Sequence, residues 1–191
     1  MAVFYRTNAQ SRMLEDMLLR AGVPYRIVGG TKFFDRAEIR DVMAYLTLVV
    51  NPSDDIAAKR VINVPRRGIG KTTIERIEQF AREMGMTFMQ GAELVVLDPE
   101  LRASTRRAVG EFVELIKEAQ EYSGELRLVV EMIVDRAGLI SALTNENTDE
   151  ARGRIENIQE FMGVVDEFSQ THEEDDAEFA APTEGDTVAG D

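Results

Sequence analysis

Cysteine is absent from the 191 residues, which excludes disulfide bonds and thiolate metal sites. Histidine occurs once, and His172 lies among acidic residues, a setting typical of a solvated side chain rather than a metal ligand. Hydrophobic runs such as residues 48–50 are far too short to span a membrane, which requires about 20 apolar residues. The first residues also lack the basic start and apolar core of a signal peptide. These absences favour a soluble, cytoplasmic protein without a metal site.

An overall positive charge, the common signature of nucleic-acid binding, is missing too, because the formal net charge is −13. The negative charge resides in residues 146–191, which hold fifteen acids and two arginines. Residues 59–82 hold seven bases and two acids, a local charge of +5. Binding to a polyanion depends on such local clusters, because each neutralised phosphate releases condensed counterions. The net charge therefore does not exclude nucleic acid as a partner.

The first thirty residues have the pattern of a parallel strand–helix–strand unit. Residues 2–6 and 25–28 carry the β-branched and aromatic side chains of short strands. Between them, apolar residues recur at helical spacing from Met13 to Ala21, and Gly22 ends this segment. Two strands joined by a helix pair in parallel, so the pattern predicts a small βαβ unit.

From Asp35 onward the periodicity is that of helices. Asp35 is predicted to cap a helix that ends before Asn51. The apolar face predicted for this helix consists of Ile39, Val42, Met43, Leu46 and Val50. A shorter helix is predicted over 56–61, and another from Thr72, where Thr72 and Glu75 form a capping box.

A capping acid followed by proline, Asp98-Pro99, predicts the start of a long helix and a domain boundary. Two further amphipathic helices are predicted over 126–137 and 155–168. Residues 169–191 are acidic and poor in apolar side chains, a composition that predicts disorder. The expected fold class is α+β and predominantly α-helical, with the βαβ unit followed by a helical bundle.

Tyr5 and Arg6 stand at the carboxyl end of the first predicted strand. Ligands of open parallel sheets collect just outside that end of the strands. A tyrosine there can stack on a flat base, and an arginine can hold phosphate oxygens with a two-pronged geometry. The same pattern also fits a rim aromatic and a surface cation, so the residues alone leave both interpretations open.

Residues 65–73 combine two glycines, three cations and the start of a helix. Glycines present backbone N–H groups at close range because they carry no Cβ, and the dipole of the helix that follows favours an anion. The combination is typical of a helix–hairpin–helix grip on a nucleic-acid backbone, with a tight inter-helix turn as the alternative. The candidate DNA contacts here are Arg66, Arg67, Gly68, Ile69, Gly70, Lys71 and Thr72. Gly138, between two predicted helices, is a weaker candidate, and an ordinary glycine helix end is the simpler interpretation there.

Two apparent nucleotide-binding motifs fail. Residues 70–72 resemble the end of a Walker A loop, which requires a glycine five residues before Gly70, where Pro65 stands. Residues 164–167 resemble the end of a Walker B strand, but the apolar stripe of a helix over 155–168 continues through them. The chain therefore lacks the residues that would cradle a triphosphate and its Mg²⁺.

Five stretches of the chain together resemble the UvrD/PcrA/Rep family of superfamily 1 ATP-dependent DNA helicases. Residues 5–12 are similar to helicase motif IV. The other four, which match in order and spacing, are residues 24–30, 33–41, 63–70 and 154–158. The resemblance extends from residue 2 to about residue 168.

The resemblance implies that residues 1–98 form the front of a second RecA-like motor domain and that residues 99–168 begin a helical domain inserted in it. Tyr5 would stack on the adenine of ATP held by the first RecA-like domain. Arg6 would be the catalytic residue, contacting the γ-phosphate across the cleft. The turn at Gly68, Ile69 and Gly70 would touch the DNA backbone near a duplex junction, and the Gly138 turn would correspond to a duplex contact.

The first RecA-like domain and the late motifs of the family are missing from the chain. ATP and Mg²⁺ would be cofactors of the parent protein, with the Mg²⁺ ligands outside this fragment. We therefore expect that the fragment alone neither hydrolyses ATP nor unwinds DNA. Two competing functions are a stand-alone helix–hairpin–helix DNA-binding module and an acidic helical adaptor that binds proteins through residues 100–168.

Overall fold

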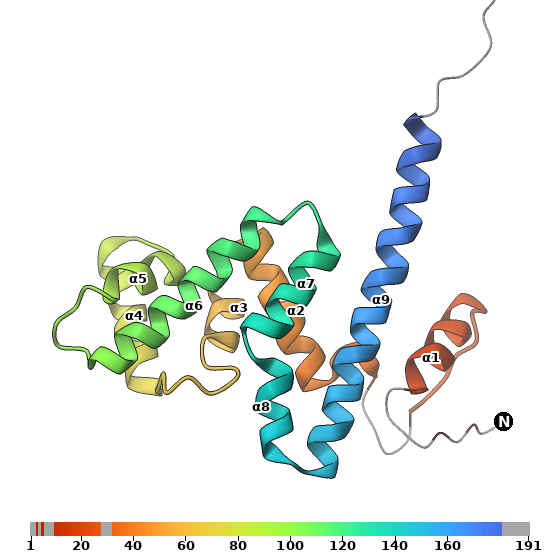
Figure 1. Ribbon diagram of the computed structural model, residues 1–191, viewed down its shortest axis with the longest axis horizontal. Coiled ribbons are helices and arrows are strands. Elements are labelled where there is room, and N and C mark those ends of the chain that lie inside the picture. The colour runs from red at the N-terminus through yellow and green to blue at the C-terminus, as the bar shows by residue number, and fades with distance from the viewer. Residues whose placement is uncertain (1–2, 4, 6–9, 28–31, 181–191) are drawn as a thin grey trace, which may run out of the picture.

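The computed structural model describes residues 3, 5, 10–27 and 32–180. The described residues form nine α-helices and one 3-10 helix (Figure 1). In chain order these are α1 (Ser11–Arg20), η2 (Phe33–Asp35), α2 (Ala37–Val50), α3 (Asp55–Val61), α4 (Lys71–Met84), α5 (Phe88–Val95), α6 (Ala103–Glu121), α7 (Leu126–Arg136), α8 (Leu139–Glu146) and α9 (Asp149–Ala180).

The predominance of helix is confirmed, but the predicted βαβ unit is wrong, because the described residues contain no strand. Residues 23–27, which include most of the second predicted strand, adopt no regular secondary structure. Of the first predicted strand only Val3 and Tyr5 are described, and neither is in a strand. A parallel pair is stable inside a larger sheet that is covered on both faces, and this chain supplies only two candidate segments.

The helix between the two predicted strands is present as α1, and it ends as predicted at Gly22. Gly22 adopts φ +65°, and the N–H of Val23 donates to the carbonyl of Leu18. This left-handed turn is the helix ending that glycine favours. Figure 1 shows α1 beside α9, at the end of the molecule opposite α4 and α5.

Helix α2 lies at the centre of the core and packs against α3, α6, α7 and α9. Tyr45 and Leu48 are fully buried along its inner face. Two residues of the predicted apolar face point outward instead, because Met43 is 43% exposed and Val50 is 82% exposed. With helices on several sides, the buried surface follows the positions of those partners rather than a single stripe of apolar residues.

Several helix boundaries differ from the predictions. The N-cap of α2 is Arg36, and Asp35, which was predicted to cap this helix, is the last residue of η2. The N-cap of α4 is Gly70, so Thr72 lies inside the helix rather than capping it. The long helix α6 begins at Ala103 with Arg102 as its N-cap, and residues 99 and 100 form a turn that the Asp98 carboxylate stabilises by accepting the N–H of Glu100. Helix α9 continues beyond residue 168 to Ala180. The predicted division into domains near residue 98 stays a prediction.

Helix α5 was not predicted, although it begins with a capping box formed by Thr87 and Gln90. Its packing against α4 is close at Gly91, where a Cβ would lie 2.9 Å from the Cβ of Ala81. None of the helices in the described residues is both long enough and apolar enough to cross a membrane.

Candidate nucleic-acid interface

The turn between α3 and α4 is held in shape by Asn63. The Asn63 side-chain oxygen accepts the N–H of Arg67 at 2.8 Å and the N–H of Ile69 at 3.2 Å. Ile69 is 1% exposed and fixes the middle of the turn in the core, while Gly68 beside it adopts φ +76°. A left-handed φ favours glycine, because a Cβ would be strained there. The turn therefore keeps Ile69 inside and leaves Gly68 and Gly70 exposed.

The amino end of α4 is open. Its N-cap is Gly70, and no side chain caps the first-turn N–H groups. Lys71 and Thr72 at this end are exposed, and the Lys71 ammonium has only a loose ion pair with Glu75 at 3.5 Å. Uncapped N–H groups at the positive end of a helix dipole are suited to an anion.

Arg66 and Arg67 point in different directions, although the sequence analysis treats them as equivalent. Arg66 is exposed, whereas Arg67 is half-buried. The Arg67 guanidinium donates to the Val64 carbonyl at 3.0 Å and to the Tyr45 hydroxyl at 2.7 Å, and it lies over the rings of Tyr45 and Phe112. Its donors have partners inside the protein, so it is not oriented toward a ligand in solvent.

Three of the seven bases at residues 59–82 are neutralised by carboxylates that belong to another helix or loop of the fold. The ion pairs are Lys59 with Glu78 at 2.8 Å, Arg60 with Asp41 at 2.8 Å, and Arg76 with Asp98 at 2.6 Å. Burial raises the pKa of Asp41, and the neighbouring Arg60 guanidinium opposes that shift. The cations that remain available at the turn are Arg66 and Lys71.

Gly138 lies close to the same turn. It adopts φ +76° between α7 and α8, and its carbonyl accepts the Ser141 hydroxyl at 3.1 Å. The carbonyl of Ala137, one residue earlier, accepts the Arg67 guanidinium at 3.4 Å. A groove of about 500 Å³ separates Arg66 and Pro65 from α8. The structure thus brings together the two glycine turns that the sequence analysis selected separately.

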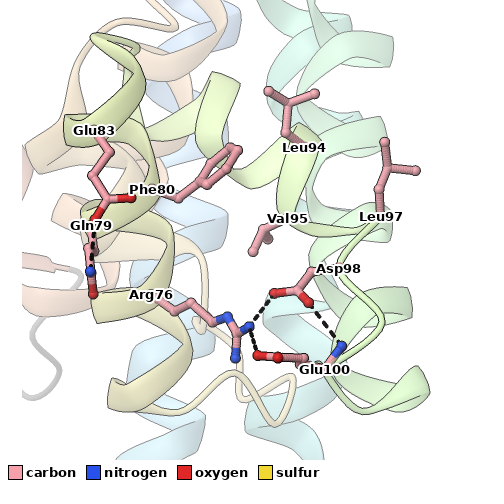
Figure 2. A pocket seen from close by; sticks show the side chains of 9 residues that line it. All are labelled: Arg76, Gln79, Phe80, Glu83, Leu94, Val95, Leu97, Asp98 and Glu100. Atoms are coloured by element: carbon pink, nitrogen blue, oxygen red, sulfur yellow. Dashed lines mark hydrogen bonds and ion pairs between the residues drawn. The ribbon is translucent and has the colours of Figure 1, made fainter.

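A second cavity, of about 660 Å³, lies between α4 and the segment that follows α5 (Figure 2). Figure 2 shows the Arg76 guanidinium directed at the carboxylates of Asp98 and Glu100, with Phe80 and Leu97 above this group in the view. The Glu100 carboxylate lies 2.5 Å from the guanidinium and raises the pKa of Arg76. Because its positive charge is already paired, this cavity is not an anion site.

Three of the stretches that resemble helicase motifs meet in a buried network near α1. Arg36, which is 5% exposed, donates to the Ser11 hydroxyl at 2.6 Å and to the Asn157 side-chain oxygen at 2.8 Å. The Asn157 amide in turn donates to the Glu38 carboxylate. Burial lowers the pKa of Arg36. The contact between these stretches was not predicted from the sequence.

Comparison with known proteins gives a family match over residues 1–181, to the UvrD-like helicase C-terminal domain. The chain belongs to this family. ATP-dependent DNA helicase PcrA of Bacillus subtilis (strain 168) is 42% identical over 175 residues, which are 91% of this chain and 24% of that protein. PcrA of Leuconostoc citreum is 35% identical over 183 residues, or 95% of this chain and 24% of that protein. PcrA of Staphylococcus aureus (strain COL) is 38% identical over 173 residues, or 89% of this chain and 23% of that protein.

The resemblance to UvrD/PcrA/Rep helicases is therefore confirmed, and the chain spans about a quarter of the length of these relatives. Of the two residues predicted to contact the nucleotide, Tyr5 is half-buried. Arg6 lies outside the described residues. Within the described part of the chain, no group of three or more His, Cys, Asp or Glu side chains could hold a metal ion.

Proposed function

We propose that this chain supplies DNA-backbone contacts and part of the nucleotide site of an ATP-dependent DNA helicase. Its relatives carry that name, and it corresponds to about a quarter of each. The remainder of such a protein would include the first RecA-like domain, which would bind ATP and Mg²⁺. ATP hydrolysis and unwinding would therefore require the whole protein, and this chain alone would do neither.

The observation that best supports the proposed DNA contact is the open amino end of α4, which is flanked by Arg66 and Lys71. Backbone N–H groups at a helix start can bind a phosphate oxygen, and no side chain competes for them at Gly70. Arg66 and Lys71 are exposed on either side of the turn and can neutralise adjacent phosphates. Contacts of this kind hold the DNA backbone without reading its sequence. The neighbouring turn at Gly138, which is partly exposed, would add a second backbone contact.

The test is the salt dependence of DNA binding by this chain, measured as the fluorescence anisotropy of a labelled duplex with a single-stranded extension. Two phosphate-binding cations predict a slope of about −2 for the logarithm of the association constant against that of the salt concentration, since each neutralised phosphate contributes about 0.9. Arg66→Ala and Lys71→Ala should each weaken binding and make the slope shallower by about 0.9.

Arg82→Ala is the matched control, because Arg82 is an exposed cation in the last turn of α4, at the end opposite Lys71. Its removal changes the net charge equally and should leave affinity and slope unchanged. An equal loss in all three variants would indicate diffuse electrostatic attraction and would reject the turn as the contact. Absence of salt-dependent binding by the parent chain would reject a backbone grip altogether.

The proposed nucleotide contacts of Tyr5 and Arg6 rest on the similarity of residues 5–12 to helicase motif IV. Tyr5 would stack on adenine, and Arg6 would stabilise charge on the γ-phosphate bound by the first RecA-like domain. In the full-length parent, Arg6→Ala should abolish ATP turnover while DNA affinity stays near that of the wild type. Wild-type turnover by that variant would remove the role assigned to Arg6.

A further inference from the structure

The guanidinium of Arg67 forms hydrogen bonds to both the α3–α4 turn and the Gly138 turn. Nη1 lies within hydrogen-bonding distance of the carbonyls of Val61, Ile62, Val64 and Pro65, at 3.0 to 3.3 Å. Nη2 donates to the Tyr45 hydroxyl at 2.7 Å and to the Ala137 carbonyl at 3.4 Å. Each nitrogen therefore serves a different part of the structure.

The carbonyls that Nη1 contacts belong to the carboxyl end of α3 and the segment just after it. The last carbonyls of a helix have no partner within the helix, and they form the negative end of its dipole. A cation placed there satisfies the carbonyls and fixes the path of the chain that leaves the helix. That chain runs directly into Gly68 and Gly70.

The carbonyl that Nη2 contacts is at the carboxyl end of a second helix. Ala137 is the C-cap of α7, and Gly138 follows it. The same nitrogen donates to the Tyr45 hydroxyl, which in turn donates to the Val64 carbonyl at 2.5 Å. Tyr45 therefore links Nη2 to the α3–α4 turn as well. The buried rings of Tyr45 and Phe112 support the guanidinium, with its central carbon 5.9 and 5.7 Å from their centroids.

We propose that Arg67 is a positioning residue that sets the two glycine turns relative to each other for DNA binding and does not itself bind phosphate. This inference rests on the proposed DNA contact of the α3–α4 turn. A planar guanidinium with five donors can serve acceptors in several directions, whereas a lysine ammonium on a flexible stem cannot reproduce that set. The shape of the guanidinium, rather than its charge, is the property that this site uses.

Charge-conserving substitutions separate the two roles. Arg67→Lys should weaken binding of the junction DNA by about tenfold or more. The substitution would displace the turn, and the loss of one charge-assisted phosphate contact from the turn corresponds to a factor of this size. Arg66→Lys, its matched control on the adjacent residue, should bind within about threefold of the wild type, because an exposed lysine ammonium also binds phosphate, as a point charge. A direct phosphate role for Arg67 predicts instead that both lysine variants bind like the wild type.

Tyr45→Phe provides a milder second variant, because it removes only the hydroxyl that Arg67 contacts and retains the ring. It should weaken DNA binding by a few-fold, and its effect should be less than additive with that of Arg67→Lys, since both disturb one network. Binding is measured well below the unfolding midpoint of each variant, verified by circular dichroism, so that a loss of stability alone does not change the affinity.

The outcomes distinguish this proposal from the function on which it rests. If Arg66→Ala and Lys71→Ala weaken binding while Arg67→Lys and Tyr45→Phe bind like the wild type, the turn is the contact but Arg67 does not position it. If strictly additive losses are found for Tyr45→Phe and Arg67→Lys, the shared network is also rejected. If Arg66→Ala and Lys71→Ala bind like the wild type, the proposed DNA contact itself fails.

Discussion

The guanidinium of Arg36 donates a 2.8 Å hydrogen bond to the side-chain oxygen of Asn157, joining residues that lie 121 positions apart in the chain. Ser11 at the start of α1 and Glu38 at the start of α2 complete the network. The segment that carries Tyr5 and Arg6 is therefore connected, through α1, to α2 and α9, which pack against α3 and α8 beside the proposed DNA contacts. A buried polar network of this kind specifies one arrangement of its helices, because any other arrangement leaves its members unsatisfied.

Asn157→Ala should lower the free energy of unfolding by about 2–3 kcal/mol, because it removes the acceptor of a buried charged donor and a hydrogen-bond donor to Glu38. Urea denaturation followed by circular dichroism measures this change. Asn145→Ala, at an exposed position in α8, is the control and should leave the unfolding free energy unchanged within error. Equal stabilities of the two variants would show that the network contributes nothing to the fold.

Tyr45 gives the chain a defined response to alkaline pH. Burial raises its pKa from 10.0 to about 12, so the folded state keeps the phenol protonated where the unfolded state would ionise it. The contribution of this group is fully present below pH 10 and is lost as pH rises toward 12. Two pKa units correspond to about 2–3 kcal/mol of unfolding free energy.

Comparison of the wild type with Tyr45→Phe isolates that contribution from the other groups that titrate at high pH. At neutral pH the variant should be less stable by about 1 kcal/mol, because the Val64 carbonyl and the Arg67 guanidinium lose a partner. The stability advantage of the wild type should shrink and reverse in alkali. A difference that stays constant with pH would mean that Tyr45 ionises equally easily in both states.

The sequence predicted those parts of the fold that depend on neighbouring residues. The stripe from Met13 to Ala21 and the stop at Gly22 predicted α1, because helix periodicity and a glycine ending are local signals. The pairing of residues 2–6 with 25–28 was wrong, because a sheet depends on distant partners that the pattern of one strand does not specify. The ion pair of Asp98 with Arg76 of α4 was not predicted for a similar reason, because it joins residues that are distant in the sequence.

The candidate site shows the same division between local and tertiary information. The glycines at 68 and 70 and the helix that follows them were recognisable, because turn residues act within a few positions. The inward orientation of Arg67 was not, because it depends on Tyr45 and Phe112, which reach it only after α2 and α6 pack together. A basic run in the sequence indicates charge, but only the folded structure shows which cations are already neutralised.

Gly91→Ala tests the close approach of α4 and α5. The added Cβ would lie 2.9 Å from the Ala81 Cβ and 3.1 Å from the Ile77 carbonyl oxygen, so one helix must shift. We expect the unfolding free energy to fall by about 1–3 kcal/mol, as in other overpacked cores. Gly153→Ala on α9, where the Cβ meets nothing within 4 Å, should raise it by about 0.5–1 kcal/mol through helix propensity. Thermal unfolding of both variants should show shifts of opposite sign.

Arg12 holds α1 against α9, and its removal should release α1 without unfolding the rest. Its guanidinium lies 3.0 Å from Glu160 and 2.7 Å from Glu167, and its hydrogen bond to Glu167 lowers the pKa of that carboxyl group. In Arg12→Ala, trypsin should cleave after Arg20 about five to ten times faster, because proteolysis follows the population of the opened helix. Arg127→Ala, which removes an ion pair between α7 and Asp166 of α9, should leave cleavage after Arg20 unchanged. If Arg12→Ala were cleaved there at the wild-type rate, α1 would be held by its apolar contacts and the buried Arg36 network, and the ion pairs of Arg12 would be incidental.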